Sequence, residues 1–280
     1  MRKESALLLE EVRNIIQEYD FALTLRQIYY QLVAKQIIPN LQKYYVKLSR
    51  LCVIGRDEGY LSEDSFADRL REIEKISSWK DLSDFADTVR NAYCKDKWIN
   101  QRNYIEIWTE KDALRGVISP ITEKWDVGLL VVRGQVSRTA IYEAYQRYRQ
   151  KREQDKECYL FYFGDFDPSG LSIYNSLRNR ISNFQGGFLS LTFDRIALTP
   201  EQIKEYKLPQ DPAKKSDPNY RRFVEEYGDN VVELDSLPPN VLRAYVEDCI
   251  KQNLNLGELK QVLKKEKKEK QELNEFLDNL

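Results

Sequence analysis

The sequence predicts an α/β protein in which a helical N-terminal domain precedes a parallel α/β domain. Residues 1–60 show helix-like apolar periodicity, interrupted at Pro39 and closed at Gly59. From residue 104 the pattern changes to short apolar runs, each followed by a polar turn and a helix-like segment. Such alternation is typical of a parallel sheet with helices on its faces. The runs are 104–108, 128–132, 158–163 and 188–198.

Changes in composition divide the chain into four parts. Residues 1–75 are expected to form a winged-helix-like DNA-binding domain, because three helices in quick succession, the last basic and aromatic, fit such a module. A plain three-helix bundle has the same periodicity and stays open as an alternative. Residues 76–103 are the expected linker, 104–255 the parallel α/β domain, and 256–280 a charged helix that is solvated or forms a weak coiled coil.

Composition excludes several kinds of chemistry. The 280 residues carry a net charge of −1 and include no histidine, which rules out Ser-His and Cys-His nucleophilic pairs and histidine metal ligands. The four cysteines form no C-x-x-C pair, so we expect a reduced, cytoplasmic protein without disulfides or a zinc site. No apolar run is long enough to cross a bilayer, so no membrane partner is expected. Any catalysis must use carboxylates, Tyr, Lys, Arg and a metal ion.

The stretch LTLRQIYYQLV places two tyrosines side by side in a predicted helix. Thr24 and Gln27 have the spacing of a capping box, so the helix is expected to begin there. Tyr29 falls on the apolar stripe, whereas Tyr30 falls on the polar face, one turn after Arg26 and within reach of its side chain. Taken alone, Tyr30 reads as an ordinary surface tyrosine of an amphipathic helix.

A basic segment surrounds this helix. Residues 21–56 contain six cationic side chains and no Asp or Glu, which offers a local positive field to a polyanion. The third helix is expected to begin near Asn40 and to turn a basic, aromatic face outward. A solvated basic face is the alternative interpretation. The candidate DNA contacts on that face are Lys43, Tyr44, Lys47 and Arg50.

Carboxylates follow two of the predicted strands. Glu110, with Lys111 beside it, comes directly after the first strand, and Asp165 and Asp167 come directly after the third. Ligands of parallel α/β sheets bind beyond the carboxyl ends of the strands, so we expect these acids to gather there. Oxygen ligands of this kind suit Mg²⁺ or Mn²⁺, and a cation would relieve the repulsion among them.

Each acid also has a simpler interpretation. Asp167 followed by proline fits a helix N-cap, and Thr109 with Asp112 resembles a capping box that would leave Glu110 an ordinary first-turn acid. A D-x-D pair also occurs in haloacid-dehalogenase-type phosphatases and in sugar-nucleotide transferases. Capping leaves unexplained why Asp165 follows an apolar strand so closely.

The motifs WTEKDAL and GDFDPSG resemble a Toprim domain, the metal-binding fold shared by topoisomerases, primases and some nucleases. Ahead of them, LTLRQIYY resembles the tyrosine motif of the topoisomerase VI A subunit and the related meiotic double-strand-break transesterase, in which a winged-helix domain carries R-x-I-Y-Y. The stretch AKKSDPNYRRF…VELDSL is similar to the C-terminal region of that A subunit. The chain is shorter than A subunits and has Ser169 where they carry a bulkier residue, which indicates a small bacterial or phage-type relative.

The resemblance implies a role for each of these residues. Tyr30 would attack DNA, Arg26 would stabilise the phenolate and the phosphate charge, and Lys111 would add a phosphate contact. The product would be a phosphotyrosyl DNA link with a free 3′ hydroxyl. The implied ligands of Mg²⁺ or Mn²⁺ are Glu110, Asp165 and Asp167.

The resemblance also implies partners. Tyr30 of one subunit would meet the metal of the other, so that a homodimer cuts double-stranded DNA. The sequence has no ATPase signature, so strand passage would depend on a separate ATPase subunit. Two other functions fit the same residues. A hydrolytic Toprim nuclease would use metal-activated water, with Tyr30 as a DNA contact only, and a non-catalytic DNA-binding or scaffold protein would use the acids as helix caps.

Overall fold

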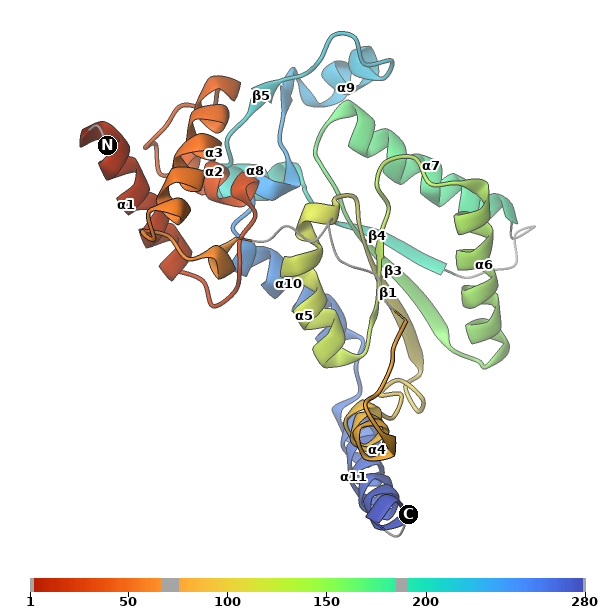
Figure 1. Ribbon diagram of the computed structural model, residues 1–280. Coiled ribbons are helices and arrows are strands. Elements are labelled where there is room, and N and C mark those ends of the chain that lie inside the picture. Colours follow the sequence, from red (N-terminus) through yellow and green to blue (C-terminus); the bar gives the residue numbers. More distant parts are fainter. Residues whose placement is uncertain (1–2, 67–75, 185–190, 279–280) are drawn as a thin grey trace.

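Three helices near the N-terminus pack around a core of their own in this computed structural model, which describes residues 3–66, 76–184 and 191–278 (Figure 1). The core draws on every one of them, through fully buried side chains such as Leu9, Ile28 and Leu48. Within the described residues this domain has one parallel β-bridge, Leu23 with Phe66, and no β-hairpin wing. The three predicted helices are confirmed, whereas a winged helix stays a prediction. The helices are α1 (Lys3–Gln17), α2 (Leu25–Ala34) and α3 (Gln42–Asp57).

Helix α2 begins where its capping residues predict. The Thr24 hydroxyl accepts a hydrogen bond from the Gln27 amide (3.2 Å), and the Gln27 side chain accepts one from the Thr24 amide (2.8 Å). Helix α3 begins at Gln42, just after the expected cap at Asn40. The Asn40 side chain instead accepts a hydrogen bond from the Tyr29 hydroxyl (3.0 Å), which ties α2 to the connection that follows it.

Four parallel strands form the sheet of the second domain, in the order β2-β1-β3-β4. The sequence prediction of a parallel α/β arrangement is therefore confirmed. Because β1 and β3 are neighbours, the residues that follow them emerge at the same edge of the sheet. The strands are β1 (Asn103–Thr109), β2 (Gly128–Val131), β3 (Glu157–Phe163) and β4 (Leu191–Ala197).

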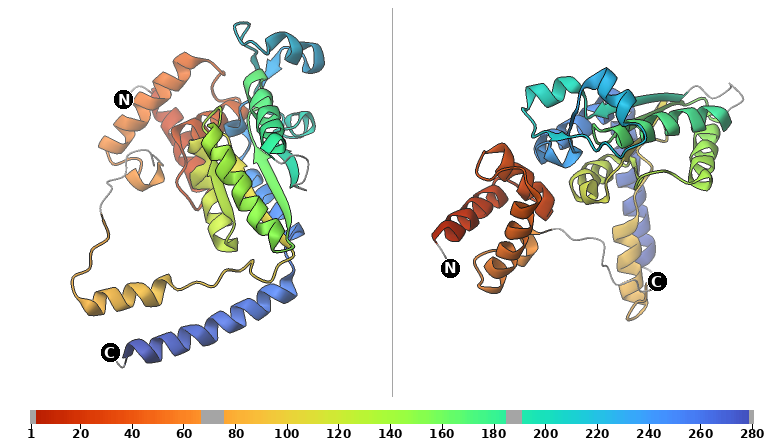
Figure 2. Two further views of the ribbon diagram at one scale, coloured as in Figure 1. Left: turned by 90° about the vertical axis from the view of Figure 1, so that its right-hand side faces the viewer. Right: turned by 90° about the horizontal axis from the view of Figure 1, so that it is seen from above.

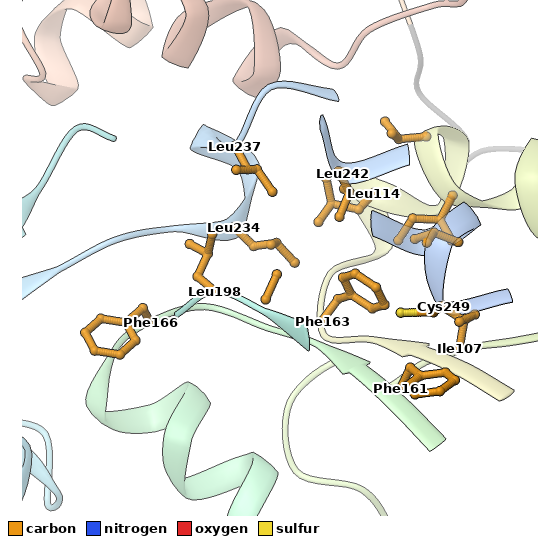
Figure 3. Packing of buried hydrophobic residues seen from close by; sticks show 14 of the residues in the cluster. Ile107, Leu114, Phe161, Phe163, Phe166, Leu198, Leu234, Leu237, Leu242 and Cys249 are labelled. Atoms are coloured by element: carbon orange, nitrogen blue, oxygen red, sulfur yellow. The ribbon is translucent and has the colours of Figure 1, made fainter. Parts of the chain in front are cut away.

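Helices cover both faces of this sheet (Figure 1). One face packs Ile107, Phe161 and Phe163 against α5 (Arg115–Trp125) and α10 (Pro239–Gln252), as Figure 3 shows for part of this cluster. The other face packs Trp108 and Tyr162 against α6 (Arg138–Glu153) and α7 (Pro168–Phe184). Each large apolar side chain buried in this way contributes about 1.5 to 3 kcal/mol. Residues of β1 and β3 alternate between the two clusters, so neither face of these two central strands is open to solvent.

A segment near the C-terminus returns to the edge of the sheet. Val232 forms an antiparallel bridge with Phe166, through hydrogen bonds of 2.9 and 3.0 Å between their backbones. This bridge places the short helix η3 (Leu234–Ser236) beside the turn that follows β3. The remaining elements are η1 (Glu63–Ser65), η2 (Asp112–Leu114), α8 (Pro200–Glu205), β5 (Asp211–Pro212), α9 (Tyr220–Tyr227) and β6 (Asn230–Val231).

Helices α4 (Leu82–Ala92) and α11 (Leu256–Asp278) lie side by side, away from the sheet (Figure 2). Ion pairs between Lys95 and Glu269 (2.9 Å) and between Arg90 and Asp278 (2.5 Å) connect α11 to α4 and to the residues that follow it. The expected charged C-terminal helix is thus present, and it packs against the linker helix. No helix in the described parts of the chain combines the length and the apolarity needed to cross a membrane.

Candidate active site

Five carboxylates gather where β1 and β3 end, together with the segment that the Phe166–Val232 bridge brings in. We refer to them as the acidic edge. Two of them, Glu110 and Asp165, follow neighbouring strands as the sequence predicted. One hydrogen bond links the two residues: the Asp165 backbone amide donates to the Glu110 carboxylate over 3.2 Å. The members of the acidic edge are Glu110, Asp165, Asp167, Glu233 and Asp235.

Asp167 caps helix α7. Its carboxylate accepts a hydrogen bond of 2.6 Å from the Gly170 amide, and the helix starts at Pro168. The capping interpretation of Asp167 is therefore correct, and this contact leaves the second oxygen of the carboxylate for other ligands. Thr109, by contrast, is a fully buried residue at the end of β1 and caps no helix, so Glu110 is not the first-turn acid of a capping box.

Lys111 lies among three carboxylates. Its ammonium nitrogen is 3.0 Å from Asp165 Oδ1, 2.9 Å from Glu233 Oε2 and 3.1 Å from Asp235 Oδ2. Burial alone would lower the pKa of this lysine, but the three carboxylates outweigh it and raise the pKa. In this arrangement Lys111 is a counter-ion for three carboxylates of the acidic edge. The motif resemblance implied only a phosphate contact for this residue.

The N-terminal domain reaches the same place through α2. Arg26 Nη1 is 3.2 Å from Glu233 Oε2, and Tyr30 lies close enough to Glu233 for the two side chains to influence each other's pKa. Tyr30 is only 5% exposed, and the neighbouring Gln27 and Gln31 are buried as well. The polar face of α2, which the sequence indicated as exposed, is thus covered around Tyr30, while Arg26 on the same face stays exposed. The resemblance implied that Tyr30 meets the acids of a partner subunit, whereas here it contacts an acid of its own chain.

The charges around Tyr30 set its acidity. Burial is the largest influence on Tyr30, and with the negative charge of Glu233 it raises the pKa of the phenol above its ordinary value. Burial would also raise the pKa of Glu233, but the cations of Lys111 and Arg26 and the nearby Tyr30 hydroxyl lower it overall. Glu233 is therefore an ionised carboxylate at neutral pH, and Tyr30 is a protonated donor.

The other carboxylates of the acidic edge crowd one another. Burial, reinforced by the charge of Glu110, raises the pKa of Asp165 to about 7. Burial and the charge of Asp167 raise the pKa of Glu110 as well. Among the described residues, the cations that act on these carboxylates include Arg26, Lys111 and Arg195, and additional positive charge would relieve the repulsion between the acids.

The donor set of the acidic edge suits a hard divalent cation, since it consists of carboxylate oxygens. Among residues 3–66, 76–184 and 191–278, no three side chains of His, Cys, Asp or Glu are arranged to hold a metal ion as they stand. The reason lies in their present partners, because Asp165 contacts Lys111 and the Leu234 amide (2.7 Å). The chemistry of Glu110, Asp165 and Asp167 fits Mg²⁺ or Mn²⁺, and the positions of their side chains would have to adjust.

The chain matches no protein-family model, no curated protein and no solved structure.

The expected DNA contacts lie on α3. Lys43, Lys47 and Arg50 are exposed, as the sequence predicted, and Tyr44 is half-buried. The contacts that the structure gives to these residues lie within the N-terminal domain, where Lys47 pairs with Glu4 (2.8 Å) and Lys43 lies 5.4 Å from the centre of the Tyr44 ring. Their role in DNA binding stays a prediction.

Three residues of the site were not singled out from the sequence: Glu233, Asp235 and Arg195. Arg195 donates to the Gly164 and Asp165 carbonyl oxygens (3.0 and 2.5 Å) and so holds the turn after β3. Glu233 and Asp235 belong to the VELDSL stretch, whose similarity to the A subunit was the one sequence signal that pointed to them. Nothing local in the sequence places that stretch beside β1 and β3.

Proposed function

We propose that this chain cleaves DNA by tyrosine transesterification, with Tyr30 as the nucleophile and Mg²⁺ or Mn²⁺ as the cofactor. One observation supports this function above the others. Helix α2 brings Tyr30 and Arg26 onto the acidic edge, so a tyrosine, two cations and a set of carboxylates from two domains meet in one place. An amphipathic surface tyrosine or a pair of helix caps would not require that meeting.

The chemistry forms one bond and breaks one bond. The phenolic oxygen of Tyr30 attacks a backbone phosphorus, and the bond from that phosphorus to the 3′ oxygen breaks. The phenolic proton passes to a carboxylate of the acidic edge, and the leaving 3′ oxygen takes up a proton from water. Arg26 and Lys111 bind the phosphate oxygens and stabilise the negative charge that develops on them. A divalent ion held by Glu110, Asp165 and Asp167 would supply further charge neutralisation at the same phosphate.

The partners follow from the motif resemblance. Two chains would be needed to cut both strands of a DNA duplex, so a homodimer is part of the proposal, and strand passage would need a separate ATPase subunit. Lys43, Tyr44, Lys47 and Arg50 of α3 would contact the backbone of the duplex. Each phosphate that these cations neutralise should add about 0.9 to the slope of the logarithm of affinity against the logarithm of salt concentration.

The test is a cleavage assay on supercoiled plasmid with Mg²⁺ or Mn²⁺, quenched with detergent and examined for protein covalently attached to DNA ends. Wild type should give attached protein, whereas Tyr30→Phe and Glu110→Ala should give none. Tyr29→Phe is the matched control, because Tyr29 is the adjacent ring on α2 and bonds to Asn40 within its own domain.

Two other results would replace the proposal. Cuts with free ends that persist in Tyr30→Phe would identify a hydrolytic metal-dependent nuclease. DNA binding that is indifferent to Mg²⁺, without any cleavage, would identify a non-catalytic DNA-binding or scaffold protein.

A further inference from the structure

Two cations converge on the Glu233 carboxylate, and Tyr30 lies beside them. Arg26 Nη1 and Lys111 Nζ lie 3.2 and 2.9 Å from the same oxygen, Oε2, and Tyr30 is close enough for its pKa to respond to the charges of all three side chains. A guanidinium, an ammonium and a hydroxyl around one anionic group are the donors that proteins use to bind phosphate oxygens. The position of the Glu233 carboxylate is therefore an anion site with a negative occupant from the chain itself.

Glu233 is held less firmly than its neighbours. Its side chain is 34% exposed and that of Arg26 is 45% exposed, whereas Asp235, which shares Lys111, is 1% exposed. If Glu233 moved away, Lys111 would keep its contacts with Asp165 and Asp235. An ion pair with this much solvent exposure shifts an equilibrium constant by a factor of about 2 to 5, so Glu233 is exchangeable.

Other contacts between the two domains involve Arg243, Asp20 and Phe21. Arg243 of α10 pairs with Asp20 (3.4 Å), whose side chain is 90% exposed, and lies 3.6 Å from the centre of the Phe21 ring. Phe21 packs against the cores of both domains. An interface of this kind permits relative movement of the domains, and such movement would let a strand of DNA reach Tyr30, which is now buried.

We propose that the Glu233 carboxylate occupies, in the chain without DNA, the position of the phosphodiester that Arg26, Lys111 and Tyr30 bind. DNA then competes with Glu233 for Arg26 and Lys111, and the closed chain keeps its tyrosine away from other nucleic acid. That the incoming anion is a DNA phosphodiester rests on the proposed function. The assignment of Glu233 as the internal occupant rests on the contacts alone.

The direction in which one substitution changes the affinity for DNA tests this inference. Glu233→Gln keeps the shape of the side chain but removes the charge that Arg26 and Lys111 pair with, so it should favour the state that is open to DNA. We expect Glu233→Gln to bind a fluorescent 30-base-pair duplex about three to ten times more tightly than wild type in EDTA, where no cleavage occurs. Glu18→Gln is the matched control. It also removes one negative charge from a partly exposed ion pair, that of Glu18 with Lys35, but it lies outside the proposed anion site.

A second substitution separates competition at the site from a general change in charge. In an Arg26→Gln background, the gain from Glu233→Gln should shrink, because the two residues act on each other and their effects are then not additive. A gain no larger than that of Glu18→Gln, or weaker binding by Glu233→Gln, would overturn the inference. Thermal unfolding of each variant shows whether the folded state is retained. Glu233→Asp is a milder variant, because it keeps the negative charge but its shorter side chain places the carboxylate farther from Arg26 and Lys111.

The outcomes distinguish this inference from the proposed function. Tighter binding by Glu233→Gln without any covalent DNA adduct in wild type would uphold the anion site and reject the transesterase. Covalent adducts with no gain from Glu233→Gln would do the reverse. No DNA binding by any variant would reject both.

Discussion

Two glutamates in this molecule each collect several donors, and they differ in where those donors come from. Glu106, in the middle of β1, is 3% exposed and accepts hydrogen bonds from the side chains of Tyr104, Trp108, Arg147 and Tyr148 over 2.7 to 3.1 Å. All of these donors belong to the same domain. Burial would raise the pKa of Glu106, but the bonds from Arg147 and the other donors lower it overall.

Glu233 has fewer donors, and they come from both domains. Its neighbours Asp165 and Asp235 compete for Lys111, and its partner Arg26 is nearly half exposed. A buried carboxylate whose donors all lie within one folded unit is a structural group, since nothing else can reach it. A carboxylate shared between two units and short of donors is where a ligand can compete. The comparison separates the two acid clusters of one sheet by function.

The largest expected effect is the loss of the structural cluster. Glu106→Gln should lower the free energy of unfolding by about 3 kcal/mol at pH 7, because it removes the charge of a buried carboxylate that pairs with Arg147 and disturbs four donors. Urea denaturation measures this. Glu157→Gln, on the neighbouring strand, removes an exposed partner of Arg102 and should leave the urea midpoint almost unchanged.

The pH dependence of that effect has a definite sign. The folded-state pKa of Glu106 is lowered, so its contribution is present above the unfolded value near 4.3 and is lost as the pH falls through the folded value. The difference between wild type and Glu106→Gln should therefore narrow below about pH 4. A difference that stays constant well below that pH would mean that packing, and not the charge, stabilises this cluster.

The next effect concerns the backbone at the acidic edge. A Cβ atom at Gly170 would lie 2.5 Å from the Asp165 carbonyl oxygen, so Gly170→Ala has to displace the turn that carries Asp165. Alanine is favoured over glycine in a helix by about 1 kcal/mol, but we expect the clash to win and to destabilise the fold by about 1 to 2 kcal/mol net. Thermal unfolding measures the change.

Gly128→Ala is the control for this clash. Its Cβ would lie at an ordinary 3.6 Å from the Glu106 side chain. If Gly170→Ala were as stable as Gly128→Ala, the turn would be adaptable and not held in one shape by its contacts.

The smallest effect has the opposite sign. Burial and Asp167 raise the pKa of Glu110, so its ionised form is disfavoured in the folded chain. Glu110→Gln should therefore leave the free energy of unfolding unchanged, or raise it by up to about 1 kcal/mol, in EDTA at pH 8.

Adding Mg²⁺ at ten times its dissociation constant should stabilise wild type by about 1.4 kcal/mol and the Glu110→Gln variant much less. Thermal unfolding with and without Mg²⁺ measures both quantities. A loss in EDTA as large as that of Glu106→Gln would make the acidic edge structural after all.

Much of the fold follows from local patterns in the sequence. The start of α2 follows from Thr24 and Gln27, because a capping box needs only residues three positions apart. The parallel sheet follows from apolar runs that alternate with helical segments, and the placement of Glu110 beside Asp165 follows from the polarity of parallel strands. The start of α2 depends on short-range geometry. Glu110 and Asp165 are 55 positions apart, and their meeting was predicted from the general rule that ligand-binding residues gather at the carboxyl ends of parallel strands.

Tertiary structure alone decided which of these residues meet. The polar face of α2 indicated an exposed Tyr30, but the face is covered, because periodicity records the polarity of a face and not what packs on it. Glu233 joins the site through a bridge between Phe166 and Val232, a pairing that no local pattern encodes. The sequence by itself determined the elements and the acids at the strand ends. Docking of α2 onto the acidic edge decided that Tyr30, Arg26 and Lys111 share one carboxylate, because contacts between residues far apart in the chain depend on the packing of whole domains.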